Sequence, residues 1–269
     1  MDTNKKLNIF YVDSFTTKQF SGNPAAVCIT ESPLEDSLMQ NIAAEINLSE
    51  TAFLYPDGPN YHLRWFTPEA EVSLCGHATL ASAFTLWNEY VKKDDVLSFK
   101  TLSGILTARR CENLIELNFP VEEVTACDFP SELVSALGCK PIFTGRTAIR
   151  YFAEIESDSE LIQLKPDIHG ISKIHPGRIA ITAKSRNPAY DFISRYFAPG
   201  IGIPEDPVTG SVHCVLAGYW AEKLGKNEFK AYQVSKRGGE MKVKLEGSRV
   251  LLLGSAVKVM KAQLMLHDS

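Results

Sequence analysis

The sequence has no excess of charge of either sign and no long apolar run. Its 28 lysines and arginines against 32 aspartates and glutamates give a formal net charge of −4, so no basic stripe faces a nucleic-acid backbone. The 17 residues 72–88 lack charge but include Ser, Thr, His and Asn, which excludes a membrane span. The polar start, residues 1–6, has no signal-peptide pattern. We therefore expect a cytoplasmic protein without nucleic-acid or membrane partners.

Metal-binding and nucleotide-binding patterns are also missing. The six cysteines form no Cys-x-x-Cys pair and show no ligand spacing with histidine, so they are expected to be reduced thiols and no metal site is predicted. No phosphate-loop lysine motif, Rossmann glycine fingerprint or nucleophile elbow occurs. These absences exclude the commonest signatures of nucleotide-dependent and serine-hydrolase chemistry.

What the sequence does contain is a duplicated element, one copy in each half. Aligning Gly76 with Gly210 also aligns Glu71 with Glu205, and residues 72–88 and 207–221 both lack Asp, Glu, Lys and Arg. A helix that is apolar or small on every side is a buried one. Its first turn has unpaired N–H groups, and a glycine there lets a ligand approach the backbone. Two such helix starts predict a single cleft that prefers an anion.

The remaining pattern is one of short strands with few helices, which indicates an α+β protein. Each half has about seven strands and one apolar helix, so we expect two pseudo-symmetric lobes, each a β-barrel-like curved sheet around a central helix. The first lobe is expected to span 1–120, completed by 255–269, and the second 121–254. The expected helices are 37–46, 76–91, 131–137 and 210–224; the expected strands are 7–12, 25–29, 51–54, 62–66, 96–100, 105–108, 114–119, 142–144, 151–155, 179–182, 191–197, 229–234, 241–245, 249–253 and 256–260.

Two side chains near the first helix start have two interpretations each. Glu50 lies between a helix end and an apolar strand; it is either a solvated strand residue or a semi-buried carboxylate with a raised pKa that transfers protons. His77 follows the helix glycine. It is either a core histidine bonded to a carbonyl or a neutral group facing a ligand, because the positive helix end disfavours its charged form.

The segment before the second helix is a shaped loop, because Pro207 cannot donate a ladder hydrogen bond. Asp206, Thr209 and Ser211 are candidates for simple helix capping. Alternatively, the Gly210 and Ser211 amides and the Ser211 hydroxyl are suited to bind a carboxylate. His213 and Cys214 lie further along the helix and are expected to pack inside the lobe.

Four segments together resemble the PhzF family of phenazine-biosynthesis-like proteins. They are Phe20–Val27, Asn47–Phe53 (with Leu-Ser-Glu-Thr), Trp65–Thr79 (with Cys-Gly-His) and Phe197–Ser211 (with Asp-Pro-Val-Thr-Gly-Ser). The resemblance implies a fold like that of diaminopimelate epimerase, with an active site between two lobes, and a homodimer.

The resemblance also implies an activity, a cofactor-independent isomerisation. The well-studied PhzF enzymes isomerise a dihydro-hydroxyanthranilate by moving a proton with one glutamate. By motif, Glu50 matches that glutamate, and His77 and Asp206 match its partners in catalysis. Gly76, Gly210 and Ser211 are then implied to bind the substrate, a small amino- or hydroxy-substituted carboxylic acid.

The residue before each helix glycine distinguishes this mechanism from that of the epimerases of the same fold. Those epimerases need an acid/base thiol at both of these positions. Here Cys75 occupies the first position but Thr209 the second, and a hydroxyl is far too weak an acid to replace a thiol. Two-thiol racemisation is thereby disfavoured, and Cys75 is expected to pack or line the cleft. A racemase or epimerase that uses Cys75 with another partner stays open as an alternative, as does a non-catalytic ligand-binding or protein-interaction member of the fold.

Overall fold

The computed structural model describes residues 5–91 and 93–266, and the chain divides into two units. Unit 1 comprises Met1–Asn118 and Leu253–Ser269, and unit 2 comprises Phe119–Leu252. The polar residues 1–4 on which the signal-peptide expectation partly rests, and the end of the expected segment 255–269, lie outside the described residues.

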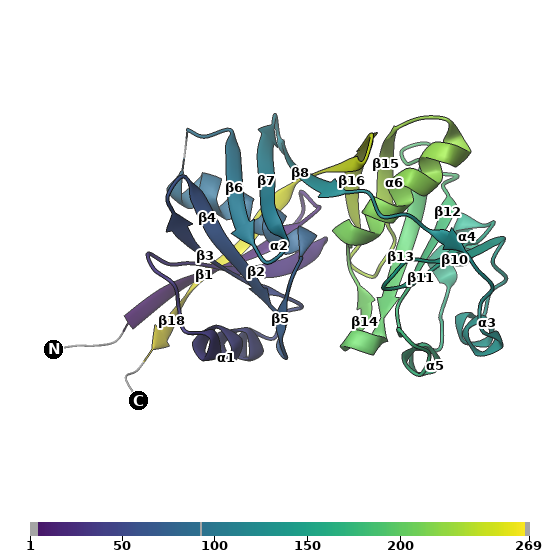
Figure 1. Cartoon of the computed structure of the whole chain (residues 1–269), viewed down its shortest axis with the longest axis horizontal. Helices are drawn as coiled ribbons and strands as arrows, with labels where there is room; N and C mark the ends of the chain where they lie inside the picture. Colours follow the sequence, from purple (N-terminus) through teal and green to yellow (C-terminus); the bar gives the residue numbers. More distant parts are fainter. Residues whose placement is uncertain (1–4, 92, 267–269) are drawn as a thin grey trace. The chain divides into compact units, whose positions relative to one another are not determined.

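The described residues of unit 1 form strands, α-helices and a π-helical turn (Figure 1). Its elements are β1 (Lys5–Ser14), β2 (Asn23–Ile29), α1 (Asp36–Ile46), β3 (Thr51–Asp57), β4 (Asn60–Phe66), β5 (Glu71–Val72), α2 (Gly76–Thr85), η1 (Leu86–Tyr90), β6 (Val96–Thr101), β7 (Gly104–Cys111), β8 (Leu114–Pro120, which ends in unit 2) and β18 (Ala256–Leu266).

Unit 2 has the same kind of composition with more short helices. Its elements are β9 (Thr125–Ala126), α3 (Ser131–Leu137), β10 (Phe143–Arg146), β11 (Tyr151–Glu154), α4 (Asp158–Gln163), α5 (Ile168–Ser172), β12 (Ile179–Lys184), β13 (Phe192–Ala198), η2 (Pro199–Ile201), β14 (Ile203–Asp206), α6 (Gly210–Leu224), β15 (Glu228–Gln233), β16 (Gly239–Glu246) and β17 (Arg249–Gly254, which ends in unit 1).

The two units repeat one pattern of strand pairing. In unit 1, β1–β2 is antiparallel, β2–β3 parallel, β3–β4 antiparallel, β4–β6 parallel and β6–β7 antiparallel. In unit 2, the same alternation runs through β10–β11, β11–β12, β12–β13, β13–β15 and β15–β16. Unit 1 also takes β18, which pairs antiparallel with β1 from Lys5↔Leu266 to Ser14↔Ala256. The repeat found in the sequence is therefore a repeat of topology.

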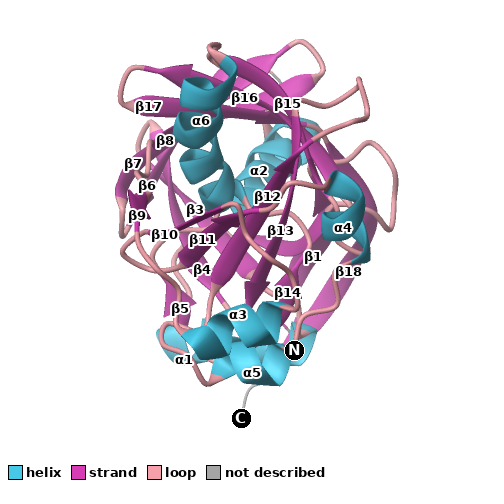
Figure 2. Ribbon diagram, turned by 90° about the vertical axis from the view of Figure 1, so that its right-hand side faces the viewer, coloured by secondary structure: helices cyan, strands magenta, loops and turns pink. Residues whose placement is uncertain are grey.

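Each sheet is covered by helices on both faces. In unit 1, α2 contacts β1, β2, β3, β7 and β18, whereas Met39, Ile42 and Ala43 of α1 pack in a separate cluster with residues of β1 to β4. In unit 2, α6 takes the place of α2, and α3, α4 and α5 pack on the opposite face. Figures 1 and 2 show α3 and α5 side by side, in contact with each other. The expected α+β fold, a curved sheet around a central helix in each lobe, is confirmed.

Strand β12 shows how alternate residues serve the two faces. Ile179, Ile181 and Ala183 belong to the cluster with α3 to α5. On the other face, Thr182 accepts a hydrogen bond from Trp220 Nε1 of α6 at 3.1 Å. The Trp220 ring stacks on Phe192 of the neighbouring strand with centroids 5.6 Å apart. The strand therefore reads as a continuous buried run because both of its faces are packed.

The central helix of unit 1 is shorter than expected. Regular α-helical bonding ends at Thr85, and residues Leu86–Tyr90 continue as a π-helix. Asn88 Nδ2 donates to the carbonyl of Phe84, and Val91 N–H to that of Leu86. The same sequence pattern is compatible with an α-helix and with a π-helical turn. The sequence therefore did not predict the change from one to the other.

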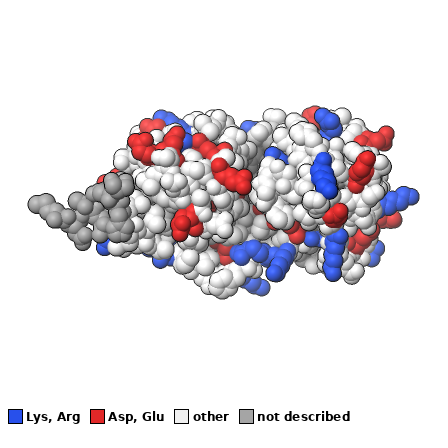
Figure 3. Space-filling model, turned by 90° about the horizontal axis from the view of Figure 1, so that it is seen from below, with Lys and Arg blue, Asp and Glu red and all other residues white. Residues whose placement is uncertain are grey.

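Within the described ranges no helix combines the length and the apolar character that crossing a membrane would need. On the face drawn in Figure 3, acidic and basic side chains occur on each unit, interspersed with uncharged surface.

The packing of unit 2 is tested by a matched pair of substitutions. Ile181 is fully buried, whereas Ile162 on α4 is 56% exposed. We expect Ile181→Ala to lower the free energy of unfolding by about 2–5 kcal/mol, through lost apolar burial and a residual cavity. Ile162→Ala should change it by no more than about 0.5 kcal/mol. Urea unfolding followed by tryptophan fluorescence measures both, and equal effects would contradict the described packing.

Candidate active site

Helix α2 begins without a side-chain cap. Its N-cap, Cys75, is extended (φ −144°, ψ 112°) and makes no capping hydrogen bond. The small polar residues of the helix are buried because they donate to the helix's own carbonyls, Thr79 to Cys75 at 2.5 Å and Ser82 to Ala78 at 2.7 Å. Because these hydrogen bonds satisfy its polar side chains, the charge-free helix can start deep in the unit. His77 lies in its first turn and is only 5% exposed.

Glu50 reaches this helix start from the beginning of β3. Helix α1 ends at Ile46, and its C-cap, Asn47, adopts a left-handed conformation (φ 55°). The backbone carbonyl of Glu50 accepts from Ala26 N–H of β2 at 3.3 Å. The Glu50 side chain is 13% exposed, and its Oε2 lies 3.3 Å from His77 Nε2. Glu50 and His77, 27 residues apart in sequence, are therefore brought together, with Glu50 placed by the pairing of β2 with β3.

His77 has a different neighbour at each ring nitrogen. Nδ1 lies 3.2 Å from Asn23 Nδ2 and 3.5 Å from Cys75 Sγ, and Nε2 faces Glu50 and, at 3.5 Å, Ser49 Oγ. Because the amide nitrogen of Asn23 only donates, Nδ1 is the acceptor. A neutral His77 then carries its proton on Nε2, directed to the side where Glu50 lies.

Asn23 is held in place by a turn that only glycine can make. Gly22 has φ +67°, and a Cβ on it would lie 2.1 Å from the carbonyl oxygen of Ser14. The hydroxyl of Ser14 in turn donates to the carbonyl of His77 at 2.8 Å. The Gly22-Asn23-Pro24 segment therefore supplies a partner to the predicted histidine.

The environment of Glu50 favours its neutral form. Burial raises the pKa of Glu50 above its ordinary value, and hydrogen bonds from Ser49 and Cys75 oppose this effect without cancelling it. Oε2 itself has no hydrogen-bond partner among the described residues. A carboxylate oxygen that is buried and held next to an imidazole is suited to accept a proton.

Cys75 lies in the same group of side chains. Ligand atoms of Glu50, Cys75 and His77 all lie within 4.8 Å of one another, which makes them a set of potential metal ligands. In this arrangement, however, the two ring nitrogens of His77 face different partners, as expected for a chain of hydrogen bonds. The expectation that the site uses no metal stays a prediction.

The start of α6 is organised by Gln233 of β15. Its side-chain carbonyl accepts from Thr209 N–H at 2.9 Å, and its amide donates to the Asp206 carbonyl at 2.7 Å. Thr209 donates its hydroxyl to Asp206 Oδ2 at 2.5 Å, and its oxygen accepts no capping hydrogen bond from an amide N–H of the helix. The capping interpretation is thus wrong for Thr209, and its hydroxyl instead orients the buried carboxylate of Asp206.

The residues that follow separate into two environments. Ser211 is half-buried and accepts a hydrogen bond from Arg150 Nη1 at 3.1 Å. His213 is fully buried, with Nδ1 2.8 Å from the Thr209 carbonyl, and burial lowers its pKa to about 4. Burial also raises the pKa of Cys214 to about 12. His213 and Cys214 therefore pack inside unit 2 as uncharged groups, as expected.

The two glutamates that align in the duplicated element have the same role. Glu71 accepts two hydrogen bonds from Arg64 of β4, both at 2.7 Å, and Glu205 accepts two from Arg195 of β13, at 2.7 and 3.0 Å. Each guanidinium also lies over the ring of a phenylalanine two residues further along its own strand. A bidentate pair thus fixes the short strand that precedes each central helix.

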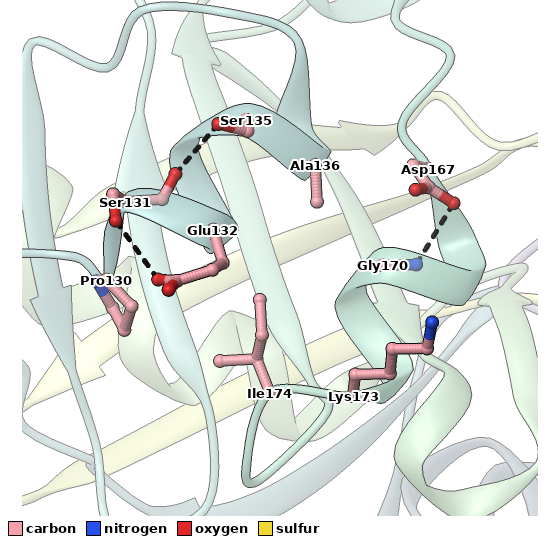
Figure 4. Close-up of a pocket in the computed structure, with 9 residues that line it drawn as sticks. All are labelled: Pro130, Ser131, Glu132, Ser135, Ala136, Asp167, Gly170, Lys173 and Ile174. Atoms are coloured by element: carbon pink, nitrogen blue, oxygen red, sulfur yellow. Dashed lines mark hydrogen bonds between the residues drawn. The ribbon is translucent and has the colours of Figure 1, made fainter.

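A cavity of about 730 Å³ lies between α3 and α5 in unit 2 (Figure 4). Several of its polar groups are bonded locally: the Ser135 hydroxyl donates to the Ser131 carbonyl at 2.9 Å, and Asp167 accepts from Gly170 N–H at 3.0 Å. No site residue predicted from the sequence lines this cavity.

The chain was also compared with known proteins. The family model for phenazine biosynthesis-like protein (PhzC-PhzF) matches residues 12–262. A protein of Halalkalibacterium halodurans, described as an uncharacterised isomerase, is 50% identical over 96% of this chain and 98% of its own length. The crystal structure of a PhzF-family phenazine biosynthesis protein from Enterococcus faecalis is similar with a TM-score of 0.93, at 38% identity, over 97% of this chain and 100% of that one.

A more distant similarity concerns the fold alone. A hydroxyproline epimerase from Agrobacterium vitis has a TM-score of 0.62 at 12% identity, over 100% of this chain and 95% of that one. The architecture is thus shared with epimerases. The stronger similarities, namely the family match, the 50% identity and the agreement with the Enterococcus structure, all indicate one family. The chain belongs to the PhzF family of phenazine biosynthesis-like proteins.

Proposed function

We propose that this chain is a cofactor-independent isomerase that moves a proton on a small amino- or hydroxy-substituted carboxylic acid, with Glu50 as the single acid/base. The observation that supports this most directly is the Glu50 carboxyl, whose Oε2 is buried and lies 3.3 Å from His77 Nε2. The isomerase description of the Halalkalibacterium relative agrees with this class of reaction.

In the proposed reaction, ionised Glu50 removes a proton from carbon and returns it to another carbon of the same substrate. Because burial raises the Glu50 pKa, the carboxylate is a stronger base than an exposed glutamate and its acid form persists to higher pH. His77, protonated on Nε2, donates to charge that develops on the substrate, and the N–H groups at the start of α2, including that of Gly76, contribute in the same sense.

Unit 2 is proposed to bind the polar groups of the substrate. The Gly210 and Ser211 amides lie in the first turn of α6, which has no side-chain cap, and the positive end of a helix attracts a carboxylate. Asp206, with Thr209 donating to one of its oxygens, is proposed to accept from an amino or hydroxyl group. These assignments make the substrate an acid with a second, hydrogen-donating substituent.

A second candidate, racemisation through Cys75, draws on the hydrogen bond between the Cys75 thiol and Glu50. At the equivalent position of unit 2, however, Thr209 has its hydroxyl committed to Asp206. A Cys75-based racemase would invert a stereocentre and lose its activity in Cys75→Ser. The single-base isomerase would retain most of its turnover in that variant.

The proposed role of Glu50 is tested by proton NMR in D₂O with a panel of amino acids, hydroxy acids and dihydro-hydroxyanthranilate. We expect deuterium to enter a carbon position, or the double bonds to move, and Glu50→Gln to slow this by at least about 100-fold, as is typical when a general base is removed. Glu45→Gln, an exposed glutamate on α1, is the matched control and should retain the wild-type rate.

Two outcomes of this experiment would count against the proposal. Turnover retained in Glu50→Gln would exclude Glu50 as the base. A rate abolished by dialysis against EDTA and restored by zinc would instead indicate metal chemistry at the Glu50, Cys75 and His77 group.

The raised Glu50 pKa also predicts a pH-dependent effect on stability. The folded protein favours the neutral carboxyl, so this contribution to stability is present below the ordinary glutamate pKa and is lost as pH rises through the raised value. We expect Glu50→Gln to unfold at a higher Tm than wild type at pH 7, and at an equal Tm below about pH 4. Thermal unfolding followed by circular dichroism at both pH values measures this; a Tm difference that does not depend on pH would contradict it.

A further inference from the structure

A buried arginine, Arg150, lies next to the start of α6. It belongs to none of the sequence motifs and has no role in the proposed mechanism. Arg150 immediately precedes β11, and its side chain is 1% exposed. Its guanidinium donates from Nη1 to Ser211 Oγ at 3.1 Å and from Nη2 to Glu122 Oε2 at 3.2 Å. Nε has no hydrogen-bond partner among the described residues. An arginine remains charged in such surroundings, so burying it with few partners costs stability.

The partners of Arg150 are themselves tied to α6. The Glu122 backbone N–H donates to the Cys214 carbonyl of α6 at 3.3 Å. On strand β13, which β12 separates from β11, the Tyr196 ring lies under the guanidinium, with its centroid 5.2 Å from Cζ. The arginine is therefore held from three sides, and its hydrogen bond to Ser211 has a fixed direction.

This hydrogen bond determines what the Ser211 hydroxyl can do. A guanidinium only donates, so Ser211 Oγ must accept from it. Serines and threonines of α2 donate to the carbonyl four residues earlier. The corresponding carbonyl for Ser211, that of Pro207, accepts instead from the Ser235 hydroxyl at 2.8 Å. Among the described residues, no acceptor takes the Ser211 hydrogen. The hydroxyl is left as a donor for a ligand.

The charges near Ser211 also favour a ligand group that accepts its hydrogen bond. Among the described residues, the carboxylate that hydrogen-bonds to Arg150 is that of Glu122, whose side chain is 27% exposed and so partly screened by water. The positive end of the α6 dipole adds to the field at Ser211. An acceptor that carries negative charge is therefore favoured there over a neutral ester or amide oxygen.

We infer that Arg150 is a positioning residue that commits the Ser211 hydroxyl to donate to an anionic group, a carboxylate, of the ligand. Arg150 acts through Ser211, since its own side chain is almost completely buried. The inference deepens the proposed function, because it rests on Ser211 binding the substrate acid.

The test uses the full chain labelled with ¹⁵N and follows the amide signals of Gly210 and Ser211. The probes are acetate, lactate and 3-hydroxyanthranilate, each compared with its methyl ester. We expect at least one acid, and no ester, to shift these signals in the wild-type protein. Arg150→Gln and Ser211→Ala should each raise the dissociation constant at least tenfold, while Arg146→Gln, an exposed arginine four residues earlier, should leave it unchanged.

A double-mutant comparison separates positioning from a general structural effect. If Arg150 acts through Ser211, Arg150→Gln combined with Ser211→Ala should bind no more weakly than Ser211→Ala alone. Arg150→Lys keeps the charge and loses the fixed geometry, so it should fall between wild type and Arg150→Gln. This variant also keeps the test decisive should Arg150→Gln fail to fold.

The inference would be overturned by any of three results: no acid shifts the two amide signals in the wild-type protein, the esters shift them equally, or the two substitutions weaken binding additively. Failure of the proposed function is distinguishable from these. Repeating the titration with Glu50→Gln reads binding at α6 independently of proton transfer, so loss of exchange without loss of binding affects only the role of Glu50.

Discussion

The bidentate pairing of an arginine with a glutamate fixes the start of the central helix in each unit, and the candidate site depends on that start. Arg64 and Arg195 lie on equivalent strands and hold Glu71 and Glu205, which precede the helix glycines by five residues in both copies. A planar fork that donates two parallel hydrogen bonds sets both the distance and the orientation of the segment it holds. With that segment placed, Gly76 and Gly210 begin their helices at equivalent points of the two sheets.

The two copies place different side chains on this shared frame. In unit 1 the helix start is surrounded by groups able to exchange a proton, namely Glu50, His77 and Cys75. In unit 2 the equivalent loop is closed by hydrogen bonds among Asp206, Thr209 and Gln233, and so is suited to hold a polar group in a fixed orientation. The duplication preserved the backbone and the ion pair while the side chains before each glycine diverged.

The sequence predicted most of the fold because its strongest signals are local. The helix from Gly210 to Leu224 was predicted with its observed bounds, since a glycine marks its start, Gly225 marks its end and no charge interrupts it. Helices α4 and α5 were missed. They are six and five residues long, which is too short to show a helical period. Their local signals in the sequence are the capping residues Ser157 and Asp167.

The candidate site was predictable only where a motif identified it. Glu50 and His77 were found through their neighbours in sequence, but Asn23, Gln233 and Arg150 were not. Their partners lie 54, 24 and 61 residues away, and nothing in the local pattern distinguishes Arg150 from an exposed arginine such as Arg146. Only strand pairing brings these side chains to the helix starts, so their roles follow from topology and not from the motifs themselves.

The pairing of β1 with β18 has a consequence for how the protein is made. Unit 1 needs residues from both sides of unit 2, because β18 follows the whole of unit 2 in sequence and pairs with β1 along its full length. During synthesis the ribosome therefore delivers every residue of unit 2 before unit 1 has received its final strand. Strand β1 is therefore translated first but has an unpaired edge until β18 has been synthesised.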